Sequence, residues 1–343
     1  MATYRVGIIG CGRPWKSEGA SGFGMGHTHA RGYEASPDAQ IVALADINLE
    51  NARAFQAEHG GDQIYTDYKE MLAREHLDIV SICTWPNLHA EMVIAAAEAG
   101  VKAIHCEKPM APTFGEARRM VEVCRERGVQ LTFNHQRRFA EPFMTARELL
   151  RSGAIGDLQR MEATCDNLFD WGTHWFDMLF FYNDETPVEW VIGQIDPRDS
   201  KTIFGVPIEG QGLSHFKYRN GVKGTLTTGF DTGGAATNRI IGSDGVIEVG
   251  LGSSVQQRIW GKGQSAWQPI PLPPPESDLG GPIIRGILDL IAALKTGREP
   301  ELSARKALQA TELIFATYES SRRRGRVDLP LQIDDSPFLA MIR

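Results

Sequence analysis

The stretch Tyr4-Arg5-Val6-Gly7-Ile8-Ile9-Gly10-Cys11-Gly12 decides the fold of this chain. An apolar run that ends in two glycines one residue apart begins the GxGxxG pattern, in which a strand, a tight turn and a helix hold a dinucleotide. The third glycine is delayed to Gly26. From Gly26 to Asp46, which closes the next apolar run at 41–45, the chain counts 20 residues, the spacing of the acid in that pattern. The sequence therefore predicts a dinucleotide-binding fingerprint that is split by an insertion.

The split fingerprint suggests a role for each of its residues. Gly10 permits the tight turn, Gly12 lets the backbone approach the pyrophosphate, and Gly26 lets the helix N-terminus face the phosphates. Asp46 is expected to accept hydrogen bonds from the adenosine ribose hydroxyls, where its carboxylate would repel a 2′-phosphate. Neither of the two residues that follow Asp46 is cationic. The predicted cofactor is therefore NAD, in preference to NADP.

The insertion itself, residues 13–25, contains two cations and two aromatic residues. Loops at this edge of a sheet can act as lids over a bound ligand. We expect Arg13 and Trp15 to fold over the pyrophosphate or the nicotinamide ribose. The alternative is a surface excursion without function.

Size and composition narrow the class of protein. A chain of 343 residues exceeds what one core usually organises, so two domains are expected. A net charge of -7 with interleaved signs argues against a nucleic-acid partner. The five cysteines are scattered and form no CxxC pair, which predicts neither disulfides nor a metal site. The N-terminus carries no apolar leader and no run of about 18 apolar residues occurs, so we expect a cytoplasmic protein without a membrane partner.

The order of predicted elements indicates an α/β protein. In residues 1–130, short β-branched runs alternate with helical stretches, which predicts a Rossmann domain with a doubly wound parallel sheet that binds NAD. In residues 131–343, short alternating segments are separated by glycine-rich turns, which predicts an α+β domain with a mainly antiparallel sheet. These segments are 188–195, 213–218, 224–229, 239–241 and 245–249. A proline-rich connection at 269–282 and two amphipathic helices follow.

Two predicted strands of the first domain end in polar segments, at 84–89 and 105–109. Ligands of open parallel sheets bind beyond the carboxyl ends of the strands, so both segments are expected near the nicotinamide. The candidate cofactor-binding residues there are Thr84, Pro86, Asn87, His89 and Glu107. Lys108 could place a cation beside the reacting carbon and stabilise a developing oxyanion. The alternative for Lys108 is a solvated surface lysine.

Three segments together resemble the Gfo/Idh/MocA oxidoreductases, named for glucose-fructose oxidoreductase and inositol dehydrogenase. They are residues 107–109 (EKP) at the end of a strand, residues 84–89 upstream, and residues 137–139 (RRF) after the fifth strand. The resemblance covers nearly the whole chain. It implies that Lys108 lies against the nicotinamide and the substrate. It also implies an open sheet in the second domain through which subunits pair, giving a homodimer or homotetramer.

The same resemblance predicts an acid and a histidine four residues apart at the start of a helix in the second domain, and Asp170 and His174 supply them. Residues at i and i+4 share one helix face. The stretch 171–182 is apolar on every side, which indicates a buried helix. Desolvation there favours the neutral imidazole that accepts a hydroxyl proton. A core histidine with a structural role is the alternative, and Asp177 is a weaker candidate acid.

The chain departs from the family where many members carry a glycine pair ahead of the acid, because residues 165–169 (CDNLF) stand in that place. Substrate contacts are therefore expected to differ. Candidate sugar-facing groups are Asp166, Asn167 and Trp171, through planar polar side chains and aromatic stacking. Packing or capping of the helix is the alternative for these three. For Asn134 and Arg138, which follow the fifth strand, substrate contacts and structural roles are both open.

These features together predict an NAD-dependent sugar or polyol dehydrogenase. A hydride would pass from a carbinol carbon to the nicotinamide, while His174 removes the hydroxyl proton, aided by Lys108 and oriented by Asp170. An aldose oxidised at its anomeric carbon to a lactone is the first expectation. The alternatives are an inositol or polyol dehydrogenase, an NAD-dependent redox-initiated glycosidase, and an NAD-sensing regulator without catalysis.

Overall fold

The chain forms two compact units in the computed structural model, which describes residues 3–14, 16–18, 22–198, 200–229, 237–251, 256–273 and 280–342. The first unit combines Met1–Ala111, Glu116–Gln136 and Glu276–Ala307. The second combines Pro112–Gly115, Arg137–Pro275 and Leu308–Arg343. Both units are discontinuous in sequence, unlike the two continuous segments expected from a division at residue 130.

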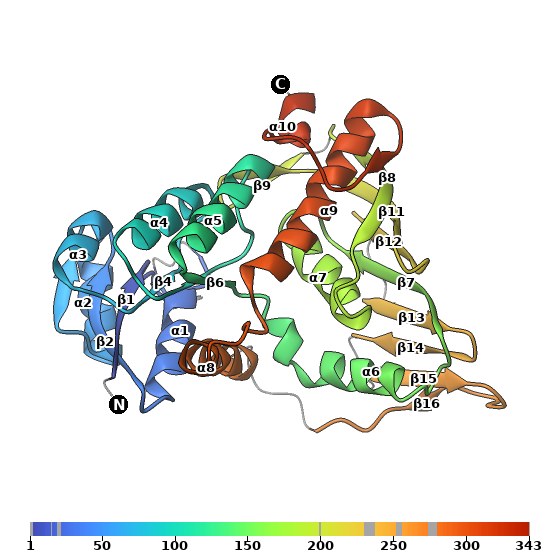
Figure 1. Cartoon of the computed structure of the whole chain (residues 1–343), viewed down its shortest axis with the longest axis horizontal. Coiled ribbons are helices and arrows are strands. Elements are labelled where there is room, and N and C mark those ends of the chain that lie inside the picture. The colour runs from blue at the N-terminus through green and yellow to red at the C-terminus, as the bar shows by residue number, and fades with distance from the viewer. Residues whose placement is uncertain are drawn as a thin grey trace. The chain divides into compact units, whose positions relative to one another are not determined.

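The first unit is built on a six-stranded parallel sheet (Figure 1). Its strands lie in the order β3-β2-β1-β4-β5-β6, which is the order of a doubly wound dinucleotide-binding fold. The strands are β1 (Tyr4–Ile9), β2 (Ala39–Ala45), β3 (Gln63–Tyr65), β4 (Ile79–Ile82), β5 (Ala103–Cys106) and β6 (Gln130–Phe133). The helices between them are α1 (Met25–Glu34), α2 (Leu49–His59), α3 (Tyr68–Arg74), α4 (Pro86–Glu98) and α5 (Phe114–Arg127). The predicted Rossmann fold is confirmed, and of the six strands only the short edge strand β3 was not predicted.

A helix from the C-terminal part of the chain belongs to this first unit. Helix α8 (Gly280–Thr296) buries one apolar face against the core of the Rossmann sheet, with Ile287 fully buried. A Cβ at Gly32 of α1 would lie 2.6 Å from Ile287 Cδ1, so the two helices approach as closely as a glycine allows. Gln130 Nε2 also donates to the Leu290 carbonyl at 3.0 Å. This packing explains why the units are discontinuous.

The second unit is built on a nine-stranded mixed sheet. The strand order is β16-β15-β14-β13-β7-β12-β11-β8-β17, and every neighbouring pair is antiparallel except β7 and β12. The strands are β7 (Leu158–Cys165), β8 (Val188–Asp196), β11 (Gln211–Tyr218), β12 (Lys223–Thr228), β13 (Asn238–Gly242), β14 (Gly245–Val249), β15 (Gln257–Gly261), β16 (Gln268–Pro269) and β17 (Val327–Asp328). The predicted mainly antiparallel sheet is confirmed.

Helices and one small hairpin complete the described part of this unit. They are α6 (Glu141–Arg151), α7 (Gly172–Tyr182) and α10 (Pro337–Met341), with the hairpin of β9 (Lys201–Ile203) and β10 (Val206–Ile208). The unit also includes residues 137–139 of η1 (Gln136–Phe139) and residues 308–323 of α9 (Ala304–Arg323). All eleven residues of α7 are buried, as its apolar sequence predicts. Its aromatic side chains pack on the sheet, where the Phe176 and Phe216 ring centroids are 5.7 Å apart. Helix α7 is therefore the core helix of the second unit.

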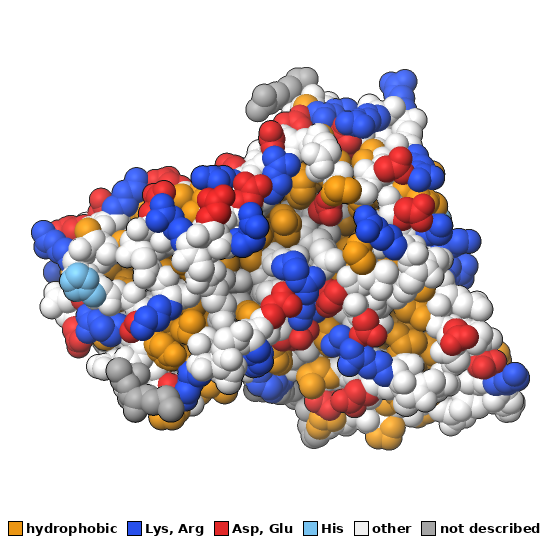
Figure 2. Space-filling model, viewed as in Figure 1, with side chains coloured by type: hydrophobic (Ala, Val, Ile, Leu, Met, Phe, Trp, Pro, Cys, Tyr) orange, Lys and Arg blue, Asp and Glu red, His pale blue; other side chains and the backbone are white. Residues whose placement is uncertain are grey.

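Acidic and basic side chains are intermingled on the face that Figure 2 shows, so neither charge dominates a patch of that face. Apolar side chains are exposed on strands of the second unit, including Ile192 on β8, Leu213 on β11 and Trp260 on β15. Every helix within the described ranges is too short or too polar to cross a membrane.

Candidate active site

The three glycines of the split fingerprint meet at one turn. Gly10 has φ of +93°, and a Cβ there would lie 2.7 Å from the Cys83 carbonyl oxygen, so the position requires glycine. Gly26 is the second residue of α1, and a Cβ there would lie 2.5 Å from the Gly10 carbonyl oxygen. A Cβ on Gly12 would meet nothing within 4 Å. The helix thus packs directly on the turn, and the turn keeps open space beside Gly12.

Asp46 lies directly after β2, beside this turn. Its Oδ2 accepts a hydrogen bond of 2.8 Å from the backbone N–H of Cys11, and its Oδ1 accepts one of 2.8 Å from the backbone N–H of Asn48. The carboxylate is half-buried. The spacing from Gly26 that the sequence shows therefore corresponds to real proximity between the acid and the glycine turn.

The insertion is closed on itself by Arg13. Its Nη1 donates to the Glu18 carbonyl at 2.7 Å, and its Nε donates to Asn51 Oδ1 on α2 at 3.3 Å. These contacts anchor the loop to α2 and occupy donors that were expected to face the cofactor. Trp15, the other residue of that expectation, lies outside the described residues.

His89 joins the two strand-end segments of the first unit. It is fully buried in α4, with Nδ1 2.9 Å from the Pro109 carbonyl oxygen and Nε2 3.1 Å from that of Thr84. Burial lowers the pKa of His89, against the opposing effect of these backbone hydrogen bonds. The geometry favours a positioning role for His89 over direct cofactor contact. Of the other residues expected in the 84–89 segment, Thr84 is half-buried, Pro86 is buried and Asn87 is exposed.

Glu107 is the centre of a buried polar network behind the end of β5. Its Oε1 accepts from Asn134 Nδ2 at 2.7 Å and lies 3.0 Å from His29 Nε2, while its Oε2 accepts from the Lys108 backbone N–H at 3.2 Å. Burial alone would raise the pKa of Glu107, but His29, Asn134 and the Lys108 charge together hold it at about 2. Asn134 is 1% exposed, so the geometry favours its structural alternative. The ionised Glu107 therefore positions the backbone of Lys108. Lys108 itself is half-buried.

Asp170 and His174 lie at the start of α7, and both are buried. The helix begins at Gly172, so Asp170 precedes it instead of forming its first turn. Asn167 Oδ1 accepts from the backbone N–H of Asp170 at 2.7 Å and of Trp171 at 3.3 Å. Since Asn167 is 0% exposed, this hydrogen bonding favours the capping alternative over a sugar contact. It also holds the Asp170 backbone in place.

The two other candidate sugar-facing residues remain accessible. Asp166 is exposed, and its carbonyl accepts from the Gly229 N–H at 3.2 Å. Trp171 is 41% exposed. Both are therefore available to a ligand, unlike Asn167.

Arg137 is a residue of this region that the sequence reasoning left without a role. Its guanidinium lies 5.5 Å from the Trp171 ring centroid and 4.5 Å from that of Trp175. Burial lowers the pKa of Arg137 to about 10, against the opposing charge of Asp170. The sequence could have suggested a role for Arg137, because it lies in the 137–139 segment (RRF). Nothing in the sequence, however, places it beside these tryptophans. Arg137 therefore supplies a buried cation beside the exposed Trp171.

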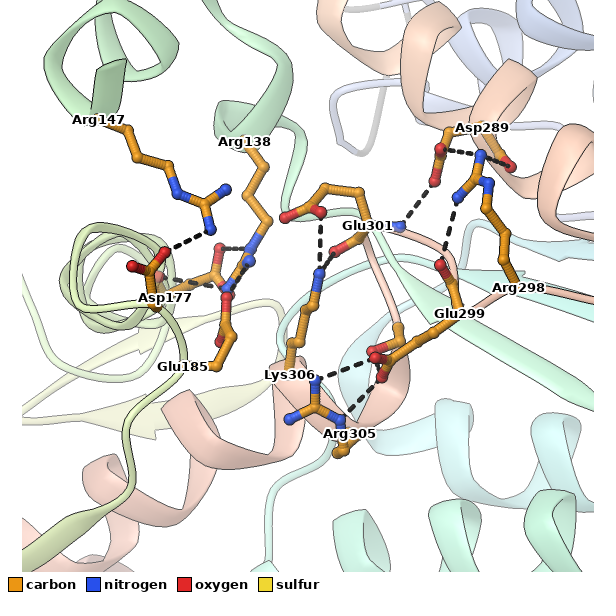
Figure 3. A network of polar contacts seen from close by, with 12 residues as sticks. Arg138, Arg147, Asp177, Glu185, Asp289, Arg298, Glu299, Glu301, Arg305 and Lys306 are labelled. Carbon is orange, nitrogen blue, oxygen red and sulfur yellow. Dashed lines mark hydrogen bonds and ion pairs between the residues drawn. The ribbon is translucent and has the colours of Figure 1, made fainter. Parts of the chain in front are cut away.

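Arg138, by contrast, is enclosed in an internal ion-pair network (Figure 3). Its guanidinium donates to both oxygens of Asp177, each at 2.8 Å, and to Glu185 Oε1 at 2.6 Å. The Arg138 side chain is 0% exposed. This geometry favours the structural role that the sequence left open for Arg138, and it places Asp177 as its counter-ion inside the unit.

A Rossmann unit with a complete glycine turn, joined to an α+β unit with a buried acid and histidine, defines a nucleotide-dependent oxidoreductase. Residues 4–135 match the model of the GFO_IDH_MocA family, described as an oxidoreductase family with an NAD-binding Rossmann fold. The first unit is therefore similar to the NAD-binding domain of the Gfo/Idh/MocA family.

Two relatives with assigned activities are similar to this chain. The chain is 27% identical to D-apiose dehydrogenase of Paraburkholderia graminis over 359 residues, which cover 95% of this chain and 90% of that protein. It is 31% identical to myo-inositol 2-dehydrogenase of Thermotoga maritima over 152 residues, which cover 44% of this chain and 42% of that protein. The likeness to D-apiose dehydrogenase therefore extends through both units. The likeness to myo-inositol 2-dehydrogenase covers less than half of either chain.

Solved structures share the fold. Levoglucosan dehydrogenase in complex with NADH and levoglucosan matches with a TM-score of 0.78 and 21% identity, covering 96% of this chain and 100% of that one. An oxidoreductase from Agrobacterium radiobacter in complex with NAD+, L-tartaric acid and magnesium matches with a TM-score of 0.77 and 20% identity, covering 99% and 100%.

Proposed function

We propose that this protein is an NAD-dependent dehydrogenase of a sugar or polyol, with an aldose oxidised at its anomeric carbon to a lactone as the first candidate reaction. The observation that carries the proposal is the D-apiose dehydrogenase relative, because that likeness includes the unit that contains Asp170 and His174. An inositol or another polyol is the second candidate substrate, in line with the myo-inositol 2-dehydrogenase relative.

The residues of the first unit suit NAD. Open space beside Gly12 and the N-terminus of α1 behind it fit a pyrophosphate, and Asp46 is available to the adenosine ribose. When bound, the nicotinamide supplies the hydride acceptor. Thr84, Pro86, Asn87 and the Glu107 segment border the strand ends where a nicotinamide would lie, with His89 and Glu107 positioning the backbone there.

Three side chains are assigned to the chemistry. His174 takes the proton of the substrate hydroxyl while a hydride leaves the carbon that bears this hydroxyl, so a C=O bond forms and two protons and two electrons leave the substrate in all. Lys108 stabilises the oxygen as negative charge develops on it. Asp170 orients the imidazole. Asp166 and Trp171 are assigned to the substrate itself, through hydrogen bonding and stacking on the indole.

The substrate panel tests the proposed reaction. The purified protein is incubated with D-apiose and other aldoses, myo-inositol, linear polyols and a nitrophenyl glycoside, each with NAD or NADP, and NADH or NADPH formation is followed by absorbance. We expect the highest kcat/KM for an aldose with NAD, with a lactone as product. Higher kcat/KM for an inositol would favour the second candidate, and release of nitrophenol would favour a redox-initiated glycosidase. Tight NAD binding with no turnover of any compound would favour a sensor.

Asp46 is expected to determine the choice of cofactor. Asp46→Ala removes a charged acceptor, and because hydrogen bonds to charged groups contribute about 1.5–3 kcal/mol, the Kd for NAD should rise roughly 10–100-fold. The Kd for NADP should change less, because removal of the carboxylate also removes its repulsion of the 2′-phosphate. Isothermal titration with both nucleotides measures this, with Glu50→Gln on α2 as the control. A wild-type protein that binds NADP more tightly than NAD would contradict the assignment.

We also propose a cytoplasmic homodimer or homotetramer that pairs through the sheet of the second unit, without nucleic-acid or membrane partners. The exposed Ile192, Leu213 and Trp260 support this, because apolar side chains on a sheet are commonly covered by a partner. Light scattering on the purified protein measures the subunit number.

A further inference from the structure

Two imidazoles and a carboxylate lie together in the first unit, in a cluster that the proposed function does not use. His27 stands on the first turn of α1, and Glu58 and His59 end α2. One ligand atom from each of the three lies within 4.8 Å of the others. Both histidine side chains are buried, whereas the Glu58 side chain is 48% exposed, so the cluster opens to solvent on its carboxylate side.

The triangle formed by the three ligand atoms has the dimensions of a metal site. His27 Nδ1 lies 2.9 Å from His59 Nε2. The Glu58 oxygens lie 3.3 Å from His27 Nδ1 and 3.4 Å from His59 Nε2. A tetrahedral zinc ion with bonds of about 2.0–2.1 Å holds its ligand atoms about 3.3 Å apart. The two nitrogens would therefore need to separate by only a few tenths of an ångström.

The outer nitrogen of each imidazole already faces an acceptor. His27 Nε2 lies 3.1 Å from the Gly12 carbonyl oxygen, and His59 Nδ1 lies 2.7 Å from Glu34 Oε1. Carbonyl and carboxylate oxygens accept, so the outer nitrogen is the one that carries the proton of each neutral ring. His27 Nδ1 and His59 Nε2 are then unprotonated, and their lone pairs face each other. Metal-bound histidines have this arrangement, with the second nitrogen donating to a carbonyl or a carboxylate.

Two nitrogen lone pairs at this separation repel each other unless a positive charge lies between them. A proton could supply that charge by making one ring cationic. A divalent metal ion uses both lone pairs and the Glu58 carboxylate at once, with its remaining position open to water.

We propose that His27, Glu58 and His59 form a binding site for a divalent first-row transition metal, with Zn²⁺ as the first candidate. Imidazole ligands favour zinc and its neighbours over Mg²⁺ and Ca²⁺, which prefer oxygen ligands. Glu34 orients His59, and His27 connects the ion to the carbonyl of Gly12 in the glycine turn. The scattered cysteines led to the sequence prediction of no metal, but these ligands come from two helices and include no thiol.

A zinc titration of the full-length, untagged protein tests this site. The protein is stripped with a chelator and titrated with Zn²⁺ against a chromophoric zinc chelator, without NAD. We expect one tight equivalent per chain. His59→Ala should abolish this binding, and Glu58→Gln should weaken it about ten-fold or more, because ligand and supporting groups each contribute at least that much to affinity. Glu50→Gln on the same helix and His215→Gln on β11 are the matched controls and should bind as the wild type does.

Cobalt identifies the ligands directly. Co²⁺ bound at this site should give visible d–d bands without a thiolate charge-transfer band, since no ligand is a cysteine. Thermal unfolding of the metal-free variants checks that they fold, and Glu58→Gln, whose side chain is solvent-exposed, carries the test if His59→Ala does not. Absence of a tight equivalent, affinity unchanged in both ligand variants, or a thiolate band would each overturn the proposal.

Discussion

His174→Asn is expected to lower kcat by about 10²–10⁴-fold, the usual contribution of a positioned general base. Asparagine keeps a polar side chain that can form hydrogen bonds in the buried start of α7 but cannot accept the hydroxyl proton at neutral pH. The Kd for NAD should stay unchanged, because His174 belongs to the second unit and the glycine turn to the first. Stopped-flow and steady-state assays with the best substrate of the panel measure kcat, and isothermal titration measures NAD binding.

Lys108→Met provides the second arm of this prediction. Removal of the cation that stabilises developing negative charge should cost about 10²–10³-fold in kcat. The matched control is Lys102→Met, which removes the exposed partner of Asp78 just before β5 and should leave kcat unchanged. His215→Gln is the control for the histidine variant. Retention of more than about a tenth of kcat in both His174→Asn and Lys108→Met would contradict the assigned mechanism.

Arg138→Met is expected to destabilise the protein by about 3–5 kcal/mol, because it leaves Asp177 as a buried carboxylate without its counter-ion. The Asp177 side chain is 1% exposed, so water cannot replace the lost guanidinium. The free energy of unfolding from urea titration, followed by fluorescence and circular dichroism, measures the effect. The activity of the fraction that remains folded should be affected far less than in His174→Asn.

An exposed arginine pair provides the control for this prediction. Arg305 and Glu299 form an ion pair whose side chains are 53% and 46% exposed (Figure 3). Arg305→Met should cost less than about 1 kcal/mol, as exposed pairs usually do. Combining Arg138→Met with Asp177→Leu and Glu185→Gln should recover part of the loss, since it removes the stranded charges. Equal destabilisation by Arg138→Met and Arg305→Met would argue against a buried ion pair that supports the core.

Much of the fold was predictable because it depends on local periodicity. The apolar runs that form β1, β2, β4, β5 and β6 alternate with helices, and this alternation determines a parallel sheet. Strand β3 escaped detection because its three residues are partly exposed. Strand β7 was also missed, although its residues from Met161 onward alternate between buried and half-buried, because it pairs in parallel with β12 across a long stretch of sequence. The place of α8 in the first unit was not predictable, since its partner α1 lies far away along the chain.

The candidate site divides in the same way. The glycines and Asp46 were found by spacing, and the structure brings them together at one turn. The roles of His89, Asn134 and Asn167 depended instead on which groups surround each side chain. In each case the structure supplies a buried hydrogen-bonding role.

By itself, the sequence determined the class of fold and the glycine turn, because these depend on residue types at short, regular spacings. Only the tertiary structure decided which polar residues are enclosed and which are accessible. Arg138 and Arg137 are neighbours in sequence, yet one is neutralised by Asp177 and Glu185 and the other lies against Trp171. The same is true of His27 and His59, which are 32 residues apart and meet only through the packing of α1 on α2. Burial and partnership are properties of the packed chain, and a side chain's chemistry follows from them.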